Sequence, residues 1–296
     1  MDNLAPIILF VYNRPGHTKR TVESLLKNTL VSRSNLFIFS DAAKNDKDLN
    51  NVEAVRHYIR TIKSFNKIEI IEREKNLGLA NSVISGVSEV IESYGKVIVL
   101  EDDMISSQYF LKFMNEVLNI FETEQRIFSV TGYTFPIKIP ELYKYPLYLS
   151  PRSSSWGWGT WKNRWEKADW RVKDFQSFIT DKSRVESFNN GGDDLTRMLQ
   201  NSISGKIDSW SVKWTYTHFL NNAYCVYPVK SRIKNIGADR SGVHTGKTKK
   251  FDAELELSDV ELSGIRTLQP NQEILIKFRK FFKKNLFNSV MQKLIN

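Results

Sequence analysis

The sequence has few of the residues that close small disulfide-linked or zinc-binding folds. Cys225 is the one cysteine among 296 residues, so an internal disulfide and a cysteine-based zinc site are both excluded. The four histidines are scattered and form no metal-spaced pair: His17, His57, His218 and His244. A chain with a single cysteine is ordinary in a reducing compartment, and we therefore expect a cytoplasmic protein.

Long hydrophobic runs and nucleotide-binding glycine motifs are also missing. No stretch of 18 apolar residues occurs, so no transmembrane helix is predicted. The first fifteen residues carry an acid at position 2 and no basic region, and their short apolar run predicts a strand rather than a signal peptide. Neither a G-x-G-x-x-G fingerprint nor a Walker A loop is present, which disfavours dinucleotide oxidoreductases and P-loop kinases.

Acidic residues are too few to balance the basic ones, and the formal net charge is +10. Such an excess favours a polyanionic partner, a membrane surface or phosphorylated small molecules. Residues 271–296 hold six Lys or Arg against one Glu, so the rest of the chain is only mildly basic. We therefore expect no nucleic-acid partner.

The same C-terminal segment has an amphipathic pattern. Phe278, Phe282, Leu286 and Val290 recur every fourth residue with basic residues between them. This pattern predicts a basic helix that suits an anionic membrane surface, and it favours a peripheral position on the inner face of the membrane. The alternative is a terminal helix packed on the body with its charges in solvent.

Apolar runs and helical patterns alternate regularly over the first 130 residues. Strand–helix–strand units at intervals of about thirty residues predict an α/β fold with a Rossmann-like, mostly parallel sheet flanked by helices. The expected strands are residues 6–12, 36–39, 68–71, 97–100 and 127–130, and the expected helices are residues 18–27, 45–62, 79–92 and 108–122.

Polar residues follow four of these strands, where parallel sheets bind their ligands. Asn13 and Arg14 follow the first strand, Asp41 the second, residues 76–78 the third, and residues 101–103 the fourth. Because the carboxyl ends of parallel strands lie at one edge of the sheet, we expect these side chains to form one site.

Glu101, Asp102 and Asp103 form a run of three carboxylates at the end of the fourth strand. Adjacent carboxylates raise one another's pKa, which a purely structural segment has little reason to do. Carboxylate oxygens are preferred ligands of Mg²⁺ and Mn²⁺, often shared with substrate phosphates. The alternative is an acidic loop that stabilises the start of the next helix; the position at a strand end favours the metal.

Five of the seven tryptophans lie within residues 153–170, interleaved with glycines. This composition predicts a loop that presents aromatic rings to a ligand, because aromatic faces stack on sugar rings and bases. We place Trp156, Gly157 and Trp158 in this surface, together with Trp210. The alternative is that these side chains fill a core.

Asp208, in GKIDSWSVKW, has apolar neighbours that suit a general base. Asp is also a favoured N-cap residue, and the sequence alone favours a cap on the following helix. Asp193 and Asp194, which follow two glycines, are expected to form a loop and a cap.

Seven segments in order resemble a known group of enzymes. PIILFVYNRPGH, FSDA, NLGL, VIVLEDD, SVTGY, SSSWGWGTW and YPVKSRIKNIG are similar to inverting glycosyltransferases with the glycosyltransferase A-type fold. The likeness is to family 2-like enzymes, to the N-acetylglucosaminyltransferase I type and to bacterial polysaccharide-assembly relatives. It spans about residues 5–246, and the EDD and WGWGTW segments are its specific parts.

The resemblance implies a nucleotide-sugar donor, with UDP favoured, and Mn²⁺ or Mg²⁺ held mainly by Asp103. It implies that Glu101 and Asp102 contact ribose and donor sugar, that Asp41 reads the uracil and that Arg14 lies near the nucleotide. The remaining residues assigned to substrate binding are Asn76, Gly78, Trp156, Gly157, Trp158, Trp210 and Arg232.

The catalytic base of the resembled enzymes maps onto Asp208 in DSW. If Ser209 occupies the position of the base instead, the base comes from Asp193 or Asp194. The expected acceptor is a hydroxyl of a glycan or a lipid-linked oligosaccharide in surface polysaccharide synthesis.

We expect a nucleotide-sugar-binding half (1–105), an acceptor-side half (106–250) and a C-terminal tail (251–296). Two other functions remain open. A sugar-phosphate nucleotidyltransferase shares the parallel sheet and carboxylate–metal chemistry, but it ordinarily carries a Gly-rich basic loop after the first strand, where this chain has only N-R-P-G. A carbohydrate-binding protein without activity accounts for the tryptophans but not for three acids at a strand end.

Overall fold

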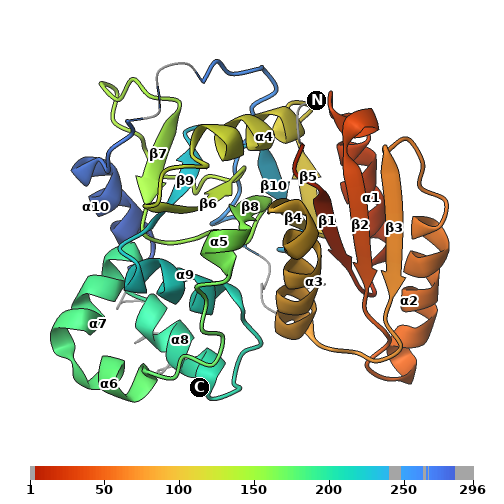
Figure 1. The fold of residues 1–296 in the computed structure, drawn as a ribbon, viewed down its shortest axis with the longest axis horizontal. Helices are drawn as coiled ribbons and strands as arrows, with labels where there is room; N and C mark the ends of the chain where they lie inside the picture. Colours follow the sequence, from red (N-terminus) through yellow and green to blue (C-terminus); the bar gives the residue numbers. More distant parts are fainter. Residues whose placement is uncertain (1–3, 240–247, 263–264, 266, 284–296) are drawn as a thin grey trace.

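One eight-stranded sheet runs through the molecule, in the order β3-β2-β1-β4-β8-β6-β9-β7. The computed structural model describes residues 4–239, 248–262, 265 and 267–283. In Figure 1 the first half of the chain builds one side of this sheet and the second half builds the other. Helices flank the sheet, and the predicted α/β class is confirmed.

The five strands predicted in the first 130 residues are all present. They are β1 (Ile7–Val11), β2 (Asn35–Ser40), β3 (Lys67–Glu72), β4 (Lys96–Glu101) and β6 (Ile127–Thr131). The first four are mutually parallel where they pair. The connecting helices are α1 (Pro15–Leu25), α2 (Asp46–Ile59), α3 (Leu79–Tyr94) and α4 (Phe110–Ile120).

The central strands are buried on both faces, which explains their unbroken apolar runs. Along β1, Ile7 and Leu9 pack with residues of α1, α2 and α4. Ile8 and Phe10 point to the other face and pack with residues of α3. Side chains of a strand alternate between its two faces, so β1 is fixed in place by both hydrophobic cores.

The tryptophan-rich segment contains a strand, which corrects the prediction of a loop. β8 (Trp158–Trp161) lies antiparallel between β4 and β6. A Cβ at Gly159 would lie 2.8 Å from the carbonyl oxygen of Val97, so glycine is required for this close approach. β7 (Leu147–Ser150) and β9 (Tyr224–Pro228) complete the eight-stranded sheet. β5 (Met104–Ser106) and β10 (Ile233–Asn235) form a second, antiparallel sheet of two strands.

Most of the tryptophans belong to the core rather than to a ligand surface. Trp158 is 0% exposed and Trp210 is 2% exposed, with ring centroids 4.8 Å apart. Trp165, Trp170 and Trp214 complete the same cluster. The expectation that Trp158 and Trp210 contact substrate is therefore corrected, because no ring face is open to a ligand.

A group of short helices lies beside the second half of the sheet (Figure 1). These elements have their own small core, in which Phe178, Phe188 and Tyr216 are buried. The group consists of α6 (Phe175–Thr180), α7 (Lys182–Phe188), η2 (Asn189–Gly191), α8 (Leu195–Ile203) and α9 (Ser211–Leu220). Two other short helices lie outside it, η1 (Val31–Arg33) in the first half and α5 (Lys162–Trp165) directly after β8.

The C-terminal helix α10 (Gln272–Phe281) packs on the body of the protein. Phe278 is 1% exposed and Phe282 is 9% exposed, and both rings contact Phe135. The prediction of a membrane-facing apolar stripe is therefore wrong for these two residues, because aromatic packing already covers them. Leu286 and Val290 lie outside the described residues. None of the described helices combines the length and the apolarity that crossing a bilayer requires.

A buried histidine gives the fold a pH-dependent stability. The Nδ1 atom of His218 lies 2.8 Å from the Trp214 carbonyl oxygen, and its Nε2 atom lies 2.8 Å from the Ser129 hydroxyl. Burial lowers the pKa of His218 to about 4 from 6.5. Between these pH values the unfolded chain binds a proton that the folded chain does not, so the free energy of unfolding falls as pH falls.

We expect His218 to reduce the free energy of unfolding by roughly 3 kcal/mol on acidification through this window. Urea unfolding of wild type and His218→Gln, at about pH 7 and about pH 4.5, checks this. The variant should lose less stability on acidification than wild type. His57→Gln, at an exposed histidine of α2, should behave as wild type. Equal losses in wild type and His218→Gln would contradict the assignment.

Candidate functional site

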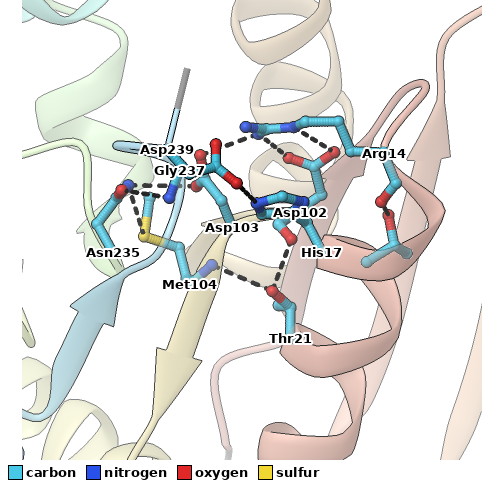
Figure 2. Close-up of polar contacts among 10 residues, drawn as sticks. Arg14, His17, Thr21, Asp102, Asp103, Met104, Asn235, Gly237 and Asp239 are labelled. Carbon is cyan, nitrogen blue, oxygen red and sulfur yellow. Dashed lines mark hydrogen bonds and ion pairs between the residues drawn. The ribbon is translucent and has the colours of Figure 1, made fainter. Parts of the chain in front are cut away.

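The acids at the end of β4 lie against an arginine from the start of α1. Arg14 donates through Nη2 to Asp102 and, at 2.9 Å, to Oδ2 of Asp103. A second bond runs from Nε of Arg14 to Asp102 at 3.3 Å. Figure 2 shows the guanidinium lying over both carboxylates. The predicted meeting of the first and fourth strand ends is therefore present in the structure.

Burial gives these acids unusual protonation behaviour. Asp102 and Asp103 are 4% and 8% exposed. Desolvation, then the charges of Asp103 and Asp102, raise the pKa of Glu101 to about 8. Desolvation raises the pKa of Asp102 to about 6 against the opposing effect of Arg14. Glu101 has no hydrogen-bond or ion-pair partner among the described residues.

The segment after β10 forms the other wall of this acid cluster. Asn235 donates from Nδ2 to Oδ1 of Asp103 at 3.3 Å, and the Ile236 amide donates to the Asp103 carbonyl at 2.9 Å. A Cβ at Gly237 would lie 2.1 Å from Oδ2 of Asp103, so only glycine fits there. Sequence reasoning assigned no role to Asn235 or Gly237, although both lie in the KNIG end of a quoted segment.

The second and third strand ends are joined by Asp41. Its carboxylate accepts hydrogen bonds from the amides of Leu77 at 3.0 Å and Gly78 at 3.2 Å. Asn76 donates to the carbonyl of Ala42 at 2.7 Å. These bonds fix the turn that begins α3. A nucleobase that donates a hydrogen bond to Asp41 would compete with these amides for the carboxylate oxygens.

Asp208 reaches this turn from the distant part of the chain. Its Oδ1 accepts from the amide of Ala80 at 3.3 Å, and a Cβ at Gly78 would lie 2.9 Å from its Oδ2. The prediction that Asp208 caps the following helix is wrong, because the N-cap of α9 is Trp210 and no side chain bonds there. Asp208 is exposed and lies at the start of α3, at the carboxyl edge of the parallel strands.

The alternative bases are engaged in ion pairs. Asp194 accepts two hydrogen bonds from Arg152, at 2.7 and 3.0 Å, and makes no cap bond to α8. Asp193 accepts from Arg279 of α10 at 2.8 Å. Both acids are therefore paired with arginines. The Asp208 carboxylate accepts instead from one backbone amide, so Asp208 is the better candidate for the base.

Three other predicted substrate residues lie elsewhere. Arg232 is 2% exposed and donates to the carbonyls of Glu256, at 3.2 Å, and Ser258, so its predicted substrate contact is corrected. A Cβ at Gly157 would lie 2.5 Å from Ile233, which gives this glycine a packing role. Trp156 is half-buried and lines a separate cavity.

The acid cluster fits a divalent cation that a ligand helps to hold. No three metal-binding side chains converge on one point in the part of the chain that the structure describes. Mg²⁺ and Mn²⁺ commonly use one or two carboxylates together with substrate phosphates. Asp103, whose Oδ1 accepts one hydrogen bond of 3.3 Å, would supply such a hard oxygen ligand, with Glu101 two residues before it in the chain.

No protein-family model and no curated protein matches the sequence. Solved structures with a similar fold include the mannosyltransferase PcManGT from Pyrobaculum calidifontis in complex with GDP-Man and Mn²⁺. Its TM-score is 0.40 at 11% identity, over 54% of this chain and 45% of that one. S. aureus TarS has a TM-score of 0.40 at 11% identity, over 77% of this chain and 36% of its own.

The S. aureus TarS 1-349 structure has a TM-score of 0.39 at 9% identity, over 77% of this chain and 59% of its own. The chain thus spans between 36% and 59% of the lengths of these proteins. These likenesses concern the fold alone and assign no role to any residue.

Proposed function

We propose that this protein is an inverting glycosyltransferase that moves a sugar from a nucleotide-sugar, preferably a UDP-sugar, to a hydroxyl of a glycan. The observation that carries the proposal is the contact of Arg14 with Asp102 and Asp103 at the carboxyl edge of the parallel sheet. Ligands of such sheets bind beyond the carboxyl ends of the strands. The guanidinium of Arg14 and the three carboxyl groups of residues 101–103 at that edge suit a diphosphate that binds together with a metal ion.

The donor half of the proposed site is formed by the ends of β1 and β4. Asp103 would hold Mn²⁺ or Mg²⁺, which supplies charge neutralisation on the departing nucleoside diphosphate when it is bound. Arg14 neutralises the acids in the free protein and is positioned to pair with donor phosphate, for which its planar guanidinium is well suited. Glu101 would contact a hydroxyl group of the donor, and Asp102 would do so in exchange for one of the bonds that its two oxygens accept from Arg14.

The proposed chemical step is a single displacement. Asp208 accepts the proton of the acceptor hydroxyl. The acceptor oxygen forms a bond to the anomeric carbon as the bond from that carbon to the diphosphate oxygen breaks. Attack from the face opposite the leaving group inverts the anomeric configuration. The proposed division is a donor half ending at about residue 105 and an acceptor side after it.

A donor-hydrolysis screen tests this function. Purified protein is incubated with UDP-, GDP- and dTDP-sugars in the presence of Mn²⁺, and release of the nucleoside diphosphate is measured. We expect release from one nucleotide class, with UDP-sugars preferred, and loss of release with a chelator. Formation of a nucleotide-sugar and pyrophosphate from a nucleoside triphosphate and a sugar 1-phosphate would favour a nucleotidyltransferase. No turnover and no nucleotide binding would favour a carbohydrate-binding protein.

A further inference from the structure

A second cavity, separate in its lining from the acid cluster, has a strong charge bias. Its volume is about 740 Å³, and it lies where α10, α8 and the segment after β7 come together. Figure 1 shows α10 beside β7 and above the short helices. Five basic side chains line it against one acid, Asp194, and we refer to it as the basic cavity. The five are Arg152, Arg197, Lys250, Lys280 and Lys283.

One of these cations is built into the wall. Arg152 is 9% exposed, and its two bonds to Asp194 hold its guanidinium 3.8 Å from the ring centroid of Phe282. A Cβ at Gly192 would lie 2.6 Å from Nη1 of Arg152, and this glycine has a φ of +143°. Glycine at this position therefore leaves room for the ion pair of Arg152 with Asp194.

Three other cations of the basic cavity are exposed to solvent. Arg197, Lys280 and Lys283 are exposed, and none has an ion-pair partner within the described ranges. Asp194 offsets only Arg152, so the lining keeps an excess of four positive charges. Clustered like charges repel one another, and an anion is the ligand that relieves this repulsion.

The remaining wall of the basic cavity is aromatic. Trp156, Phe135 and Phe251 line it beside Phe281 and Phe282. Trp156 is held edge-on by Tyr133, with ring centroids 4.5 Å apart, and its indole N–H has no partner within the described ranges. A half-buried indole that retains a free donor suits the apolar face and the hydroxyls of a sugar.

We infer that the basic cavity binds a phosphate group carried next to a sugar, so the glycan acceptor is phosphorylated. This inference rests on the proposed function only in naming that ligand as the acceptor. Arg197, Lys280 and Lys283 contact the phosphate, and Trp156 contacts the sugar. A phosphodiester within a glycan polymer and the diphosphate of a lipid-linked sugar both present this chemistry.

Calorimetric titration of the full chain tests the inference, with glucose 1-phosphate and unphosphorylated glucose as probes. Each titration is run without nucleotide and again with saturating UDP and Mn²⁺. We expect glucose 1-phosphate to bind at least tenfold more tightly than glucose in both cases, with affinity falling as salt rises. Equal affinities would overturn the inference. Failure of UDP to bind rejects the proposed donor site and leaves the result on the basic cavity unaffected.

Matched variants locate the binding. Arg197→Gln/Lys280→Gln/Lys283→Gln removes three unpaired charges and should weaken glucose 1-phosphate at least tenfold without changing the thermal midpoint. The control Arg20→Gln/Lys27→Gln/Lys63→Gln, at exposed positions in the first half, removes the same charge and should change affinity less than twofold. Equal weakening by both variants would mean that the affinity depends on net charge alone, and it would overturn the assignment of the basic cavity as the binding site.

Two further experiments test the sugar contact of Trp156 and distinguish a polymer from a lipid as the source of the ligand. Trp156→Ala should weaken glucose 1-phosphate more than inorganic phosphate; equal weakening would remove the sugar contact. Glycerol-phosphate-linked glucose and farnesyl-diphosphate-linked N-acetylglucosamine represent polymer and lipid sources, and the tighter one identifies the source. If only phosphatidylglycerol vesicles bind, and the triple variant abolishes that binding, the surface is a membrane contact and the inference is wrong.

Discussion

Replacing Asp103 with alanine should lower the kcat/KM for sugar transfer by about a thousandfold. A metal held by Asp103 would supply several kcal/mol of charge stabilisation to the departing diphosphate, and each 1.36 kcal/mol corresponds to about tenfold in rate. The fold should persist, because Arg14 keeps its bonds to Asp102 and the Ile236 amide still reaches the Asp103 carbonyl. Steady-state kinetics with the donor found in the screen measures the effect.

A matched control separates this effect from loss of surface charge. Asp259→Asn removes the charge of an exposed acid paired with Lys112. Because surface ion pairs contribute little to stability, the fold should be unchanged, and kcat/KM should stay within about twofold of wild type. Circular dichroism and the thermal midpoint should agree among the three proteins. A normal rate in Asp103→Ala would remove Asp103 from the proposed metal site.

Replacing Asp208 with asparagine should lower kcat by about a hundredfold to ten-thousandfold, as expected for loss of a general base. The KM for the donor should change little, because Asp208 acts on the acceptor in the proposed step. Asparagine keeps an oxygen that can accept from the Ala80 amide, so the start of α3 should be preserved. Kinetics at saturating donor, with the acceptor varied, measures the change.

Asp194→Asn is the informative companion to this variant. Asp194 was the alternative base, and the structure instead gives it a bidentate pair with Arg152. The Asp194 variant should keep most of its kcat at saturating acceptor. Its affinity for glucose 1-phosphate should differ from that of wild type, because the partner of Arg152 is changed. A larger loss of kcat in Asp194→Asn than in Asp208→Asn would transfer the role of base to Asp194.

The sheet of the first half could be predicted because its strands are buried on both faces. Their side chains form short unbroken apolar runs, and β1 shows this in full with five buried residues. β8 could not be predicted in the same way, because its WGTW sequence has two small residues between two tryptophans and no apolar run. Its position between β4 and β6 depends on Gly159 allowing close approach, which is a tertiary property.

The candidate site was predictable where it depends on topology alone. Arg14 and residues 101–103 follow neighbouring parallel strands, so their contact follows from the strand order. The contact of Asp208 with Ala80 joins residues 128 positions apart, and no local pattern encodes it. Arg232 was misassigned because a buried arginine that serves backbone carbonyls has the same sequence signature as one that binds substrate.

We propose that Asp103 and a nucleoside diphosphate share a divalent cation. A crystal grown or soaked with UDP and Mn²⁺, measured at the manganese absorption edge, tests this most directly. We expect an anomalous peak at bonding distance from an Asp103 oxygen and from both UDP phosphates. A peak elsewhere, or bound UDP with Asp103 still paired only to Arg14 and Asn235, would contradict it.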